Sequence, residues 1–246
     1  ATQARALRAA NTRANLENEL FGMYMDDNFI AKAEAWKQRH GGKKAGYREM
    51  IPGDDFDLGE DGSALYYADW DVVGIMFRDW KPAQSHNISI QGTSGKTSYF
   101  LSVGYNHEEG VMTFNPDKLN KYNANMNVTS DITNWLQIGG RFSYSDKAYT
   151  TPNTRRNTYT YMWRWGSFFG PYGTYQGIDM KNDIAYLKQA GDDKTNDSYT
   201  RIGAFLKATI IKGLTLNADY TFNINNKTTK SVGLPVICWN SWGGKL

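Results

Sequence analysis

The 246-residue sequence lacks the features that hold small domains together or bind cofactors. Its single cysteine, Cys238, excludes an intrachain disulfide framework and a zinc site built from cysteines. The three histidines are far apart in the chain, and none belongs to an H-E-x-x-H motif, so no metal site is predicted from them. The sequence contains no Walker motif and no G-x-S-x-G motif, and no G-x-G-x-x-G follows a predicted strand. We therefore expect neither an enzyme nor a bound cofactor.

Long apolar runs and a strong net charge are also missing. The mean hydropathy is −0.62, and no apolar run approaches the ~20 residues of a transmembrane helix, which excludes a helical membrane protein. A net charge of +3 without a basic stripe gives no reason to expect a nucleic-acid partner. Residues 1–10 contain arginines but no apolar stretch, so they are not a secretory signal. We expect the chain to be a mature protein or, more plausibly, an internal piece of a longer one.

What the sequence does contain is a repeated alternation of apolar and small polar residues. It is found in residues 99–106, 122–129, 136–145 and 214–224. In each segment one parity is mostly Tyr, Leu, Ile, Val or Phe, and the other is mostly Asn, Ser, Thr or Gly. Because successive strand side chains point to opposite faces, each segment is predicted to be a strand with one apolar and one polar side.

Two architectures are compatible with this alternation. A soluble antiparallel sandwich buries its apolar parity against a second sheet. A transmembrane β-barrel turns the same parity to lipid and the polar parity to an aqueous lumen. The strands that contain these segments are expected to run about 10 to 13 residues, as a tilted membrane strand requires, and their polar sides are poor in Lys and Glu. These details favour an all-β fold: a partial antiparallel transmembrane β-barrel of about six strands with long, partly helical extracellular loops.

The connections support the barrel. Tight turns near 92–96, 130–133 and 212–213 alternate with long connections, as in barrels with short periplasmic turns and long external loops. The predicted strands cover residues 86–92, 97–109, 118–130, 133–147, 199–211 and 213–226.

The chain divides into two unlike parts. Residues 1–85 are predicted to be an extracellular, partly helical loop region, and residues 86–246 a barrel segment with a long loop at about 148–198. The first part contains a helical pattern over residues 4–20. A second helix is predicted to be capped by Asp26 and Asp27 and to end at residues 40–42, His-Gly-Gly.

The parity of the strands predicts which side chains face water and which face lipid. The polar residues expected to face the lumen are Asn123, Asn125, Asn127, Arg141, Asn217 and Asp219. The aromatic residues on the apolar parity near strand ends are expected to form a girdle at the membrane interface; they are Tyr99, Tyr105, Trp135 and Tyr144. In a barrel this role is structural.

The densest aromatic run of the chain lies in the loop at 159–175. Flat rings stack on sugar or peptide groups, and an arginine among them could hold a hydroxyl or carboxylate. The alternative is that these rings pack the loop against its neighbours or against another protein. The candidate substrate-binding residues are Trp163, Arg164, Trp165, Phe168, Phe169, Tyr172 and Tyr175.

An acidic loop at 52–62 is a weak candidate for calcium, since carboxylate oxygens are the ligands that Ca²⁺ prefers. Its spacing differs from the regular pattern of an EF-hand, so a solvated loop is the main expectation. The candidate ligands are Asp54, Asp55, Asp57, Glu60 and Asp61.

Residues 85–105, then Glu109-Gly110-Val111 and residues 121–128, resemble the SusC/RagA-type TonB-dependent transporters. The resemblance covers about residues 65–147 and implies a barrel of about 22 strands with an N-terminal plug in its lumen. It also implies import of oligosaccharides or peptides through the outer membrane of a Gram-negative bacterium, energised by the TonB complex. A SusD-like surface lipoprotein would form the lid.

This chain departs from the complete family pattern. It shows no TonB box, no plug and only about six strands, so it resembles a slice of the barrel, with outer-membrane lipid on one side. Contact with TonB would then require the missing N-terminal part. The alternative from another class is a soluble or surface-attached β-sandwich binding module of the carbohydrate-binding type.

Overall fold

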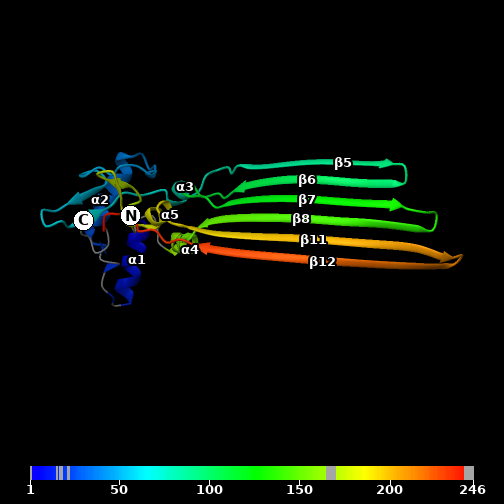
Figure 1. Ribbon diagram of the computed structural model, residues 1–246. Helices are drawn as coiled ribbons and strands as arrows, with labels where there is room; N and C mark the ends of the chain where they lie inside the picture. Colours follow the sequence, from blue (N-terminus) through cyan, green and yellow to red (C-terminus); the bar gives the residue numbers. More distant parts are fainter. Residues whose placement is uncertain (1, 15, 17–18, 21–22, 165–169, 241–246) are drawn as a thin grey trace.

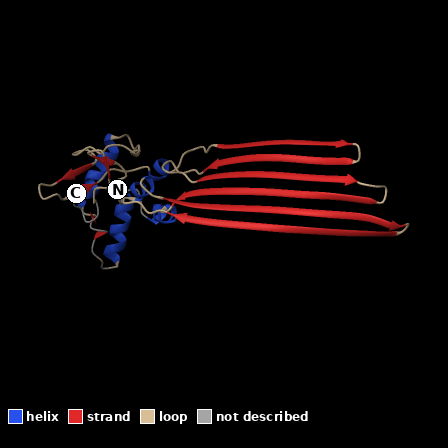
Figure 2. Ribbon diagram, viewed as in Figure 1, coloured by secondary structure: helices blue, strands red, loops and turns tan. Residues whose placement is uncertain are grey.

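The computed structural model describes residues 2–14, 16, 19–20, 23–164 and 170–240. These residues form two regions that differ in kind: a long, open sheet and a compact body at one end of it (Figure 1). Strands make up the sheet, whereas the helices gather in the body (Figure 2).

The sheet is an antiparallel meander in which each strand pairs with the next one along the chain. The expected all-β fold with six strands is therefore confirmed, and the sheet is not closed into a barrel among the described residues. In spatial order the strands are β5 (Ala83–Ser94), β6 (Thr97–Glu109), β7 (Lys118–Asp131), β8 (Leu136–Pro152), β11 (Asp192–Ile211) and β12 (Leu214–Ser231).

Three short turns lie together at the end of the sheet far from the body (Figure 1). Two of them use a glycine with positive φ, Gly95 at 59° and Gly213 at 89°, a region that residues with a Cβ rarely adopt. The long connections lie at the opposite end, where they build the body. This arrangement agrees with the expected alternation of tight turns and long loops.

The strands are longer than the sequence indicated. They run from 12 residues in β5 to 20 in β11, and at about 3.3 Å per residue β11 is about 66 Å long. The prediction was most wrong at the body end, where β8 continues to Pro152 and β11 begins at Asp192. These extensions carry polar residues on both parities, so no alternation identifies them.

Within the body, α2 (Asp27–Arg39) forms where its end signals predicted a helix. The Asp26 carboxylate accepts a hydrogen bond from the Phe29 amide, at 2.8 Å, which satisfies a free donor of the first turn. The helix stops at His40, after which Gly41 and Gly42 take positive φ. By contrast α1 (Thr2–Arg13) ends before the predicted limit of residue 20, and residues 19–20 form a short strand.

The remaining elements of the body are short. They are β1 (Glu19–Leu20), β2 (Met23–Tyr24), β3 (Phe56–Leu58), β4 (Ala64–Tyr66), α3 (Val72–Met76), α4 (Arg155–Arg164), β9 (Thr174–Tyr175), β10 (Ile178–Asp179) and α5 (Asp183–Lys188).

The body has a true hydrophobic core, to which segments from both halves of the chain contribute. Side chains from α2 and from residues 45–77 pack against side chains of residues 172–187. The largest fully buried members are Trp36, Trp70, Phe56, Met25 and Met76. The loop between β8 and β11 is thus folded onto the N-terminal segment, which fixes the body at the ends of the strands.

Candidate functional site

The strand register places the apolar parities of all six strands on one face of the sheet. Pairing partners can be followed across the sheet along a single row. That row reads Ile90, Leu101, Met126, Phe142, Ile202 and Phe222. We call the side that carries this row the apolar face. A one-residue slip of any strand would turn its apolar side chains to the other side of the sheet. Apart from an irregularity between Thr209 and Ile211, the register of β11 and β12 shows no such slip.

The apolar face is uncovered among the described residues. Ile88 and Tyr220 are each 73 % exposed, and Phe222 is 53 % exposed. Water-soluble monomers rarely expose a contiguous apolar patch larger than a few hundred Å². A sheet with six such strands therefore needs an apolar partner or an apolar solvent on this side.

The opposite side of the sheet, which we call the polar face, is a hydrogen-bonded surface. The neighbouring row there reads Ser89, Ser102, Asn125, Ser143, Arg201 and Asn223. The Asn125 side chain bonds to the hydroxyls of Ser102 and Ser143, at 3.4 and 3.0 Å. All residues expected to face a lumen lie on this face by register: Asn123, Asn125, Asn127, Arg141, Asn217 and Asp219.

A charged cluster lies on the polar face near the short turns. Arg141 donates to the Asp219 carboxylate at 3.1 Å, and its guanidinium lies 4.6 Å from the centre of the Phe205 ring. The ring in turn covers Gly139, where a methyl group would lie 2.2 Å from it. A hollow of about 260 Å³ beside the cluster also exposes Lys207. The polar face thus offers donors, acceptors and both signs of charge to a polar solute.

Of the residues expected to form an aromatic girdle, Tyr99, Tyr105 and Tyr144 lie on the apolar face by register, whereas Trp135 has the parity of the polar residues of β8. Tyr99 is close to the first short turn, where its ring covers Gly92, and Trp135 directly precedes β8 at the second turn. Tyr105 pairs with Tyr122 nearer the body, with ring centroids 5.0 Å apart. From Trp135 to Tyr144 a strand of nine steps spans about 30 Å, which after a tilt of about 40° approaches the ~25 Å apolar band of an outer-membrane barrel.

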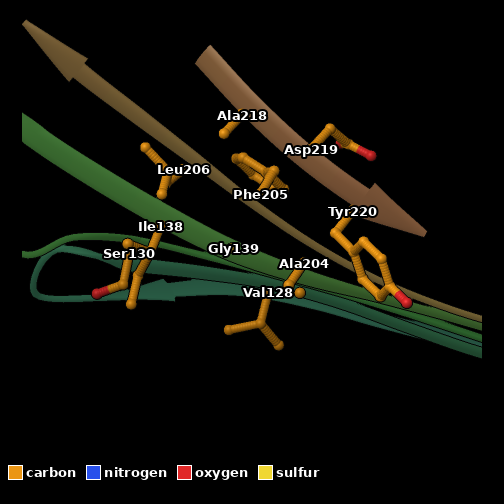
Figure 3. Close-up of a pocket in the computed structure, with 11 residues that line it drawn as sticks. Val128, Ser130, Ile138, Gly139, Ala204, Phe205, Leu206, Ala218, Asp219 and Tyr220 are labelled. Carbon is orange, nitrogen blue, oxygen red and sulfur yellow. The ribbon is translucent and has the colours of Figure 1, made fainter. Parts of the chain in front are cut away.

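Small residues leave a shallow dent in the apolar face, with a volume of about 530 Å³ (Figure 3). Its lining includes the small residues Gly140, Ala204 and Ala218, together with Val128 and Tyr220. A methyl group at Gly140 would meet no atom nearer than the Gly203 carbonyl oxygen at 3.9 Å. The dent is part of the apolar face and not a separate cavity.

The aromatic loop is only partly described. Trp163 and Arg164 are the last residues of α4, and Trp165, Phe168 and Phe169 lie outside the described residues. Tyr172 is 3 % exposed inside the core of the body. Tyr175 packs against Phe56 and Trp239. These two tyrosines therefore take the packing role that was the alternative to ligand contact.

The acidic loop does not assemble its carboxylates around one point. Asp54 binds Arg39 and His40, and Asp57 pairs with Lys32 at 2.7 Å. Glu60 and Asp61 are exposed, and Asp61 accepts from the Ser63 amide. Over the described residues, no three His, Cys, Asp or Glu side chains are placed to hold a metal ion.

Asp55 of the same loop is fully buried and organises its surroundings. It accepts two hydrogen bonds from Arg48, at 2.5 and 2.7 Å, one from the Trp36 indole at 3.0 Å and one from the Ile51 amide at 2.8 Å. Burial opposes the ionisation of Asp55, but these donors outweigh it, so the pKa lies below its ordinary value. The prediction of a solvated loop is wrong for this residue.

A second polar cluster was not predicted from the sequence. Asp179 accepts hydrogen bonds from Tyr47 and from Lys188, whose ammonium also donates to the Tyr47 hydroxyl at 2.6 Å. Burial, and then the hydrogen bond to Asp179, raise the pKa of Tyr47. Tyr47 lies 132 positions before Asp179 and 141 positions before Lys188 in the sequence, so no local motif could have indicated the cluster. It ties β10 and α5 to the N-terminal segment.

No protein-family model matches this chain, and no curated protein matches it. No helix in the described part of the chain is long and apolar enough to cross a membrane.

Solved structures give a clearer likeness. A structure of the RagAB peptide transporter matches with a TM-score of 0.54 and 22 % identity, over 71 % of this chain and 21 % of that one. A structure of the RagAB peptide importer in its closed-closed state matches with a TM-score of 0.55 and 23 % identity, over 72 % and 21 %. At this identity the likeness shows a shared fold, and the chain spans about a fifth of the length of those chains.

Proposed function

We propose that this chain is part of the wall of a TonB-dependent nutrient transporter in the outer membrane of a Gram-negative bacterium. The observation that carries the proposal is the register, which puts one uncovered apolar face across six strands opposite one uncovered polar face. In a barrel the first face meets lipid and the second lines an aqueous passage. The fold likeness to a peptide importer supports the same assignment.

The rest of the molecule is consistent with this orientation. The three short turns would be periplasmic and the body extracellular, because outer-membrane barrels keep their long loops outside. The open strand edges of β5 and β12 would be paired with further strands, since unpaired edges are not tolerated in lipid. Oligosaccharides or peptides are the nutrient classes we propose, and the fold likeness to a peptide transporter favours peptides.

Two partners follow from the proposal. A SusD-like lipoprotein would close over the extracellular body, in keeping with the likeness to RagAB structures. The TonB complex would act through parts of the transporter that this chain does not include.

A β-sandwich binding module is the competing function. It would need a second sheet against the apolar face, whereas the described residues supply none. It would also leave strands of 12 to 20 residues, longer than the usual 3–10 of soluble proteins, without an explanation.

A pair of neighbouring charges separates the two functions. We expect Leu101→Arg to reduce the amount of folded transporter in the outer membrane, because arginine near the bilayer centre costs about 2–4 kcal/mol. Ser102→Arg, one residue along the same strand but on the polar face, is the matched control. The measurement is the folded, heat-modifiable band of the full-length protein in outer-membrane fractions.

The result can also contradict the proposal. If both variants reach the membrane equally well, the apolar face does not meet lipid. If instead the unaltered protein is found in the aqueous fraction and only Leu101→Arg unfolds it there, the sandwich module is correct.

A further inference from the structure

The body contains a pocket whose charges are not balanced. It lies between the end of α2 and residues 43–54 and has a volume of about 320 Å³. Its lining includes Trp36, His40, Lys43, Lys44 and Arg48.

Most charges around the pocket are paired with each other. Arg48 is matched by Asp55 through two hydrogen bonds, and Arg39 is matched by Asp54 at 2.9 Å. The Asp54 carboxylate also accepts a hydrogen bond from the His40 ring, at 3.0 Å. Both carboxylates are therefore already engaged by cations of the chain itself.

Two positive charges remain. Lys43 and Lys44 are exposed, and neither ammonium has an ion pair among the described residues. Two lysine charges at the mouth of one small concavity make a positive potential that attracts an anionic group.

The backbone that carries these lysines is fixed at both ends. On one side Gly42 donates to the Lys37 carbonyl at 2.8 Å, which closes the end of α2. On the other side Ala45 is bridged to Trp70, with Ala45 donating to Asp69 and accepting from Asp71, both at 2.8 Å. Ordering this loop costs little on binding, since the fold has already ordered it.

The rest of the pocket suits a compact, planar group. The His40 ring stacks on the Trp36 indole, with centroids 4.2 Å apart and an angle of 22° between planes. Gly46 contributes no side chain, and a methyl group there would meet nothing within 4 Å. A space of about 320 Å³ accommodates a group about the size of one amino-acid residue.

We propose that this pocket binds a carboxylate, such as an acidic side chain of a peptide, through Lys43 and Lys44, with the His40 ring, which stacks on the buried Trp36, as one wall. The pocket is separate from the polar face of the sheet, so its occupancy does not depend on transport. With this pocket, the body would bind a ligand in addition to covering the ends of the strands.

The test is a binding measurement on the full-length protein in detergent. The probe is the peptide acetyl-Gly-Glu-Gly-amide, and acetyl-Gly-Gln-Gly-amide is its neutral counterpart. Each exposed charge pair is worth about 0.2–1 kcal/mol, so Lys43→Gln and Lys44→Gln should each weaken binding of the Glu peptide about 1.4- to 5-fold. The double variant should weaken it about 2- to 30-fold.

Lys37→Gln is the matched control, because it removes one exposed charge from the neighbouring helix α2 without altering the lining. It should leave binding unchanged, and raising the salt concentration should weaken binding of the Glu peptide. Equal binding of the Gln peptide, or unchanged binding by the double lysine variant, would overturn the proposal. Inorganic phosphate that displaces the peptide with equal or higher affinity would overturn the assignment to a carboxylate. None of these readouts requires the protein to transport anything, so they are distinct from tests of the barrel.

Discussion

The sheet and the body use the same apolar residue types in opposite ways. In the body Trp36 is 1 % exposed and Phe56 is fully buried, as in any protein folded in water. On the apolar face of the sheet Ile88 is 73 % exposed and sits in a regular row with its neighbours. The body therefore buries its apolar side chains away from water, whereas the sheet leaves them on one face for an apolar medium or partner to cover.

We predict that substitutions can destabilise the body and the sheet separately. The largest loss of stability is expected in the body. Asp55→Ala should cost about 3–5 kcal/mol, because it leaves Arg48 without its carboxylate and the Trp36 indole without its acceptor. Hydrogen exchange of the full-length protein should show faster exchange in the body and unchanged protection in β5 to β8.

Asp57→Ala is the control for that substitution. The side chains of Asp57 and Lys32, which form an ion pair, are each about 40 % exposed, and such pairs contribute about 0–1 kcal/mol to the stability of the folded state. The lowered pKa of Asp55 adds a pH dependence: its contribution to stability is present above the ordinary pKa of 3.8 and is lost as the pH falls below it. Loss of protection throughout the sheet in Asp55→Ala would mean that the two regions are one cooperative unit.

A smaller effect should be confined to the sheet. Gly139→Val is expected to cost about 1–3 kcal/mol, since its side chain would displace the Phe205 ring that lies over Gly139. Gly140→Ala, on the opposite face, has room for its methyl group and should change stability by less than about 0.5 kcal/mol. The temperature at which the folded form loses its resistance to detergent measures both. Equal effects at the two glycines would argue that the Phe205 contact is not what constrains this part of the sheet.

The smallest effect returns to the body and depends on pH. Burial raises the pKa of Asp183 from 3.8 to about 6, so the folded state holds more protons than the unfolded state between these values. Stability therefore falls as the pH rises from about 3.8 to about 6, and the full penalty is present above pH 6.

Asp183→Asn should remove that penalty. We expect a gain of about 1–2 kcal/mol at pH 8 and almost none at pH 4, after allowance for the partial exposure of the side chain. Urea midpoints followed by tryptophan fluorescence at the two pH values provide the measurement. A gain of the same size at both pH values would show that the charge of Asp183 is not its cause.

Local signals in the sequence were sufficient for much of the fold. The cap at Asp26 and the glycines after His40 placed α2 correctly, and the period-two pattern placed the middle of every long strand. The period-two pattern could not identify strand segments that have no apolar side. Residues 192–198 of β11 are polar on both sides of the strand, so they show no alternation and were assigned to a loop.

The long-range contacts could not be predicted from one sequence. Asp55 reads as one acid among several in a polar loop, and only the folded body brings Arg48 and Trp36 to it. The same holds for the contact of Lys188 with Tyr47 across 141 positions. The polar face was predictable by parity, whereas the Arg141–Asp219 pair required the register of three strands.

The central claim is that the apolar face meets lipid and the polar face meets water. The most direct measurement places a nitroxide label at each of residues 100–105 of β6 in the full-length protein, after Cys238 and any other native cysteine are replaced. If the apolar face meets lipid, oxygen dissolved in the bilayer should reach the labels at 101, 103 and 105. A water-soluble nickel chelate should then reach those at 100, 102 and 104. Accessibility without a period of two, or with the two parities reversed, would contradict it.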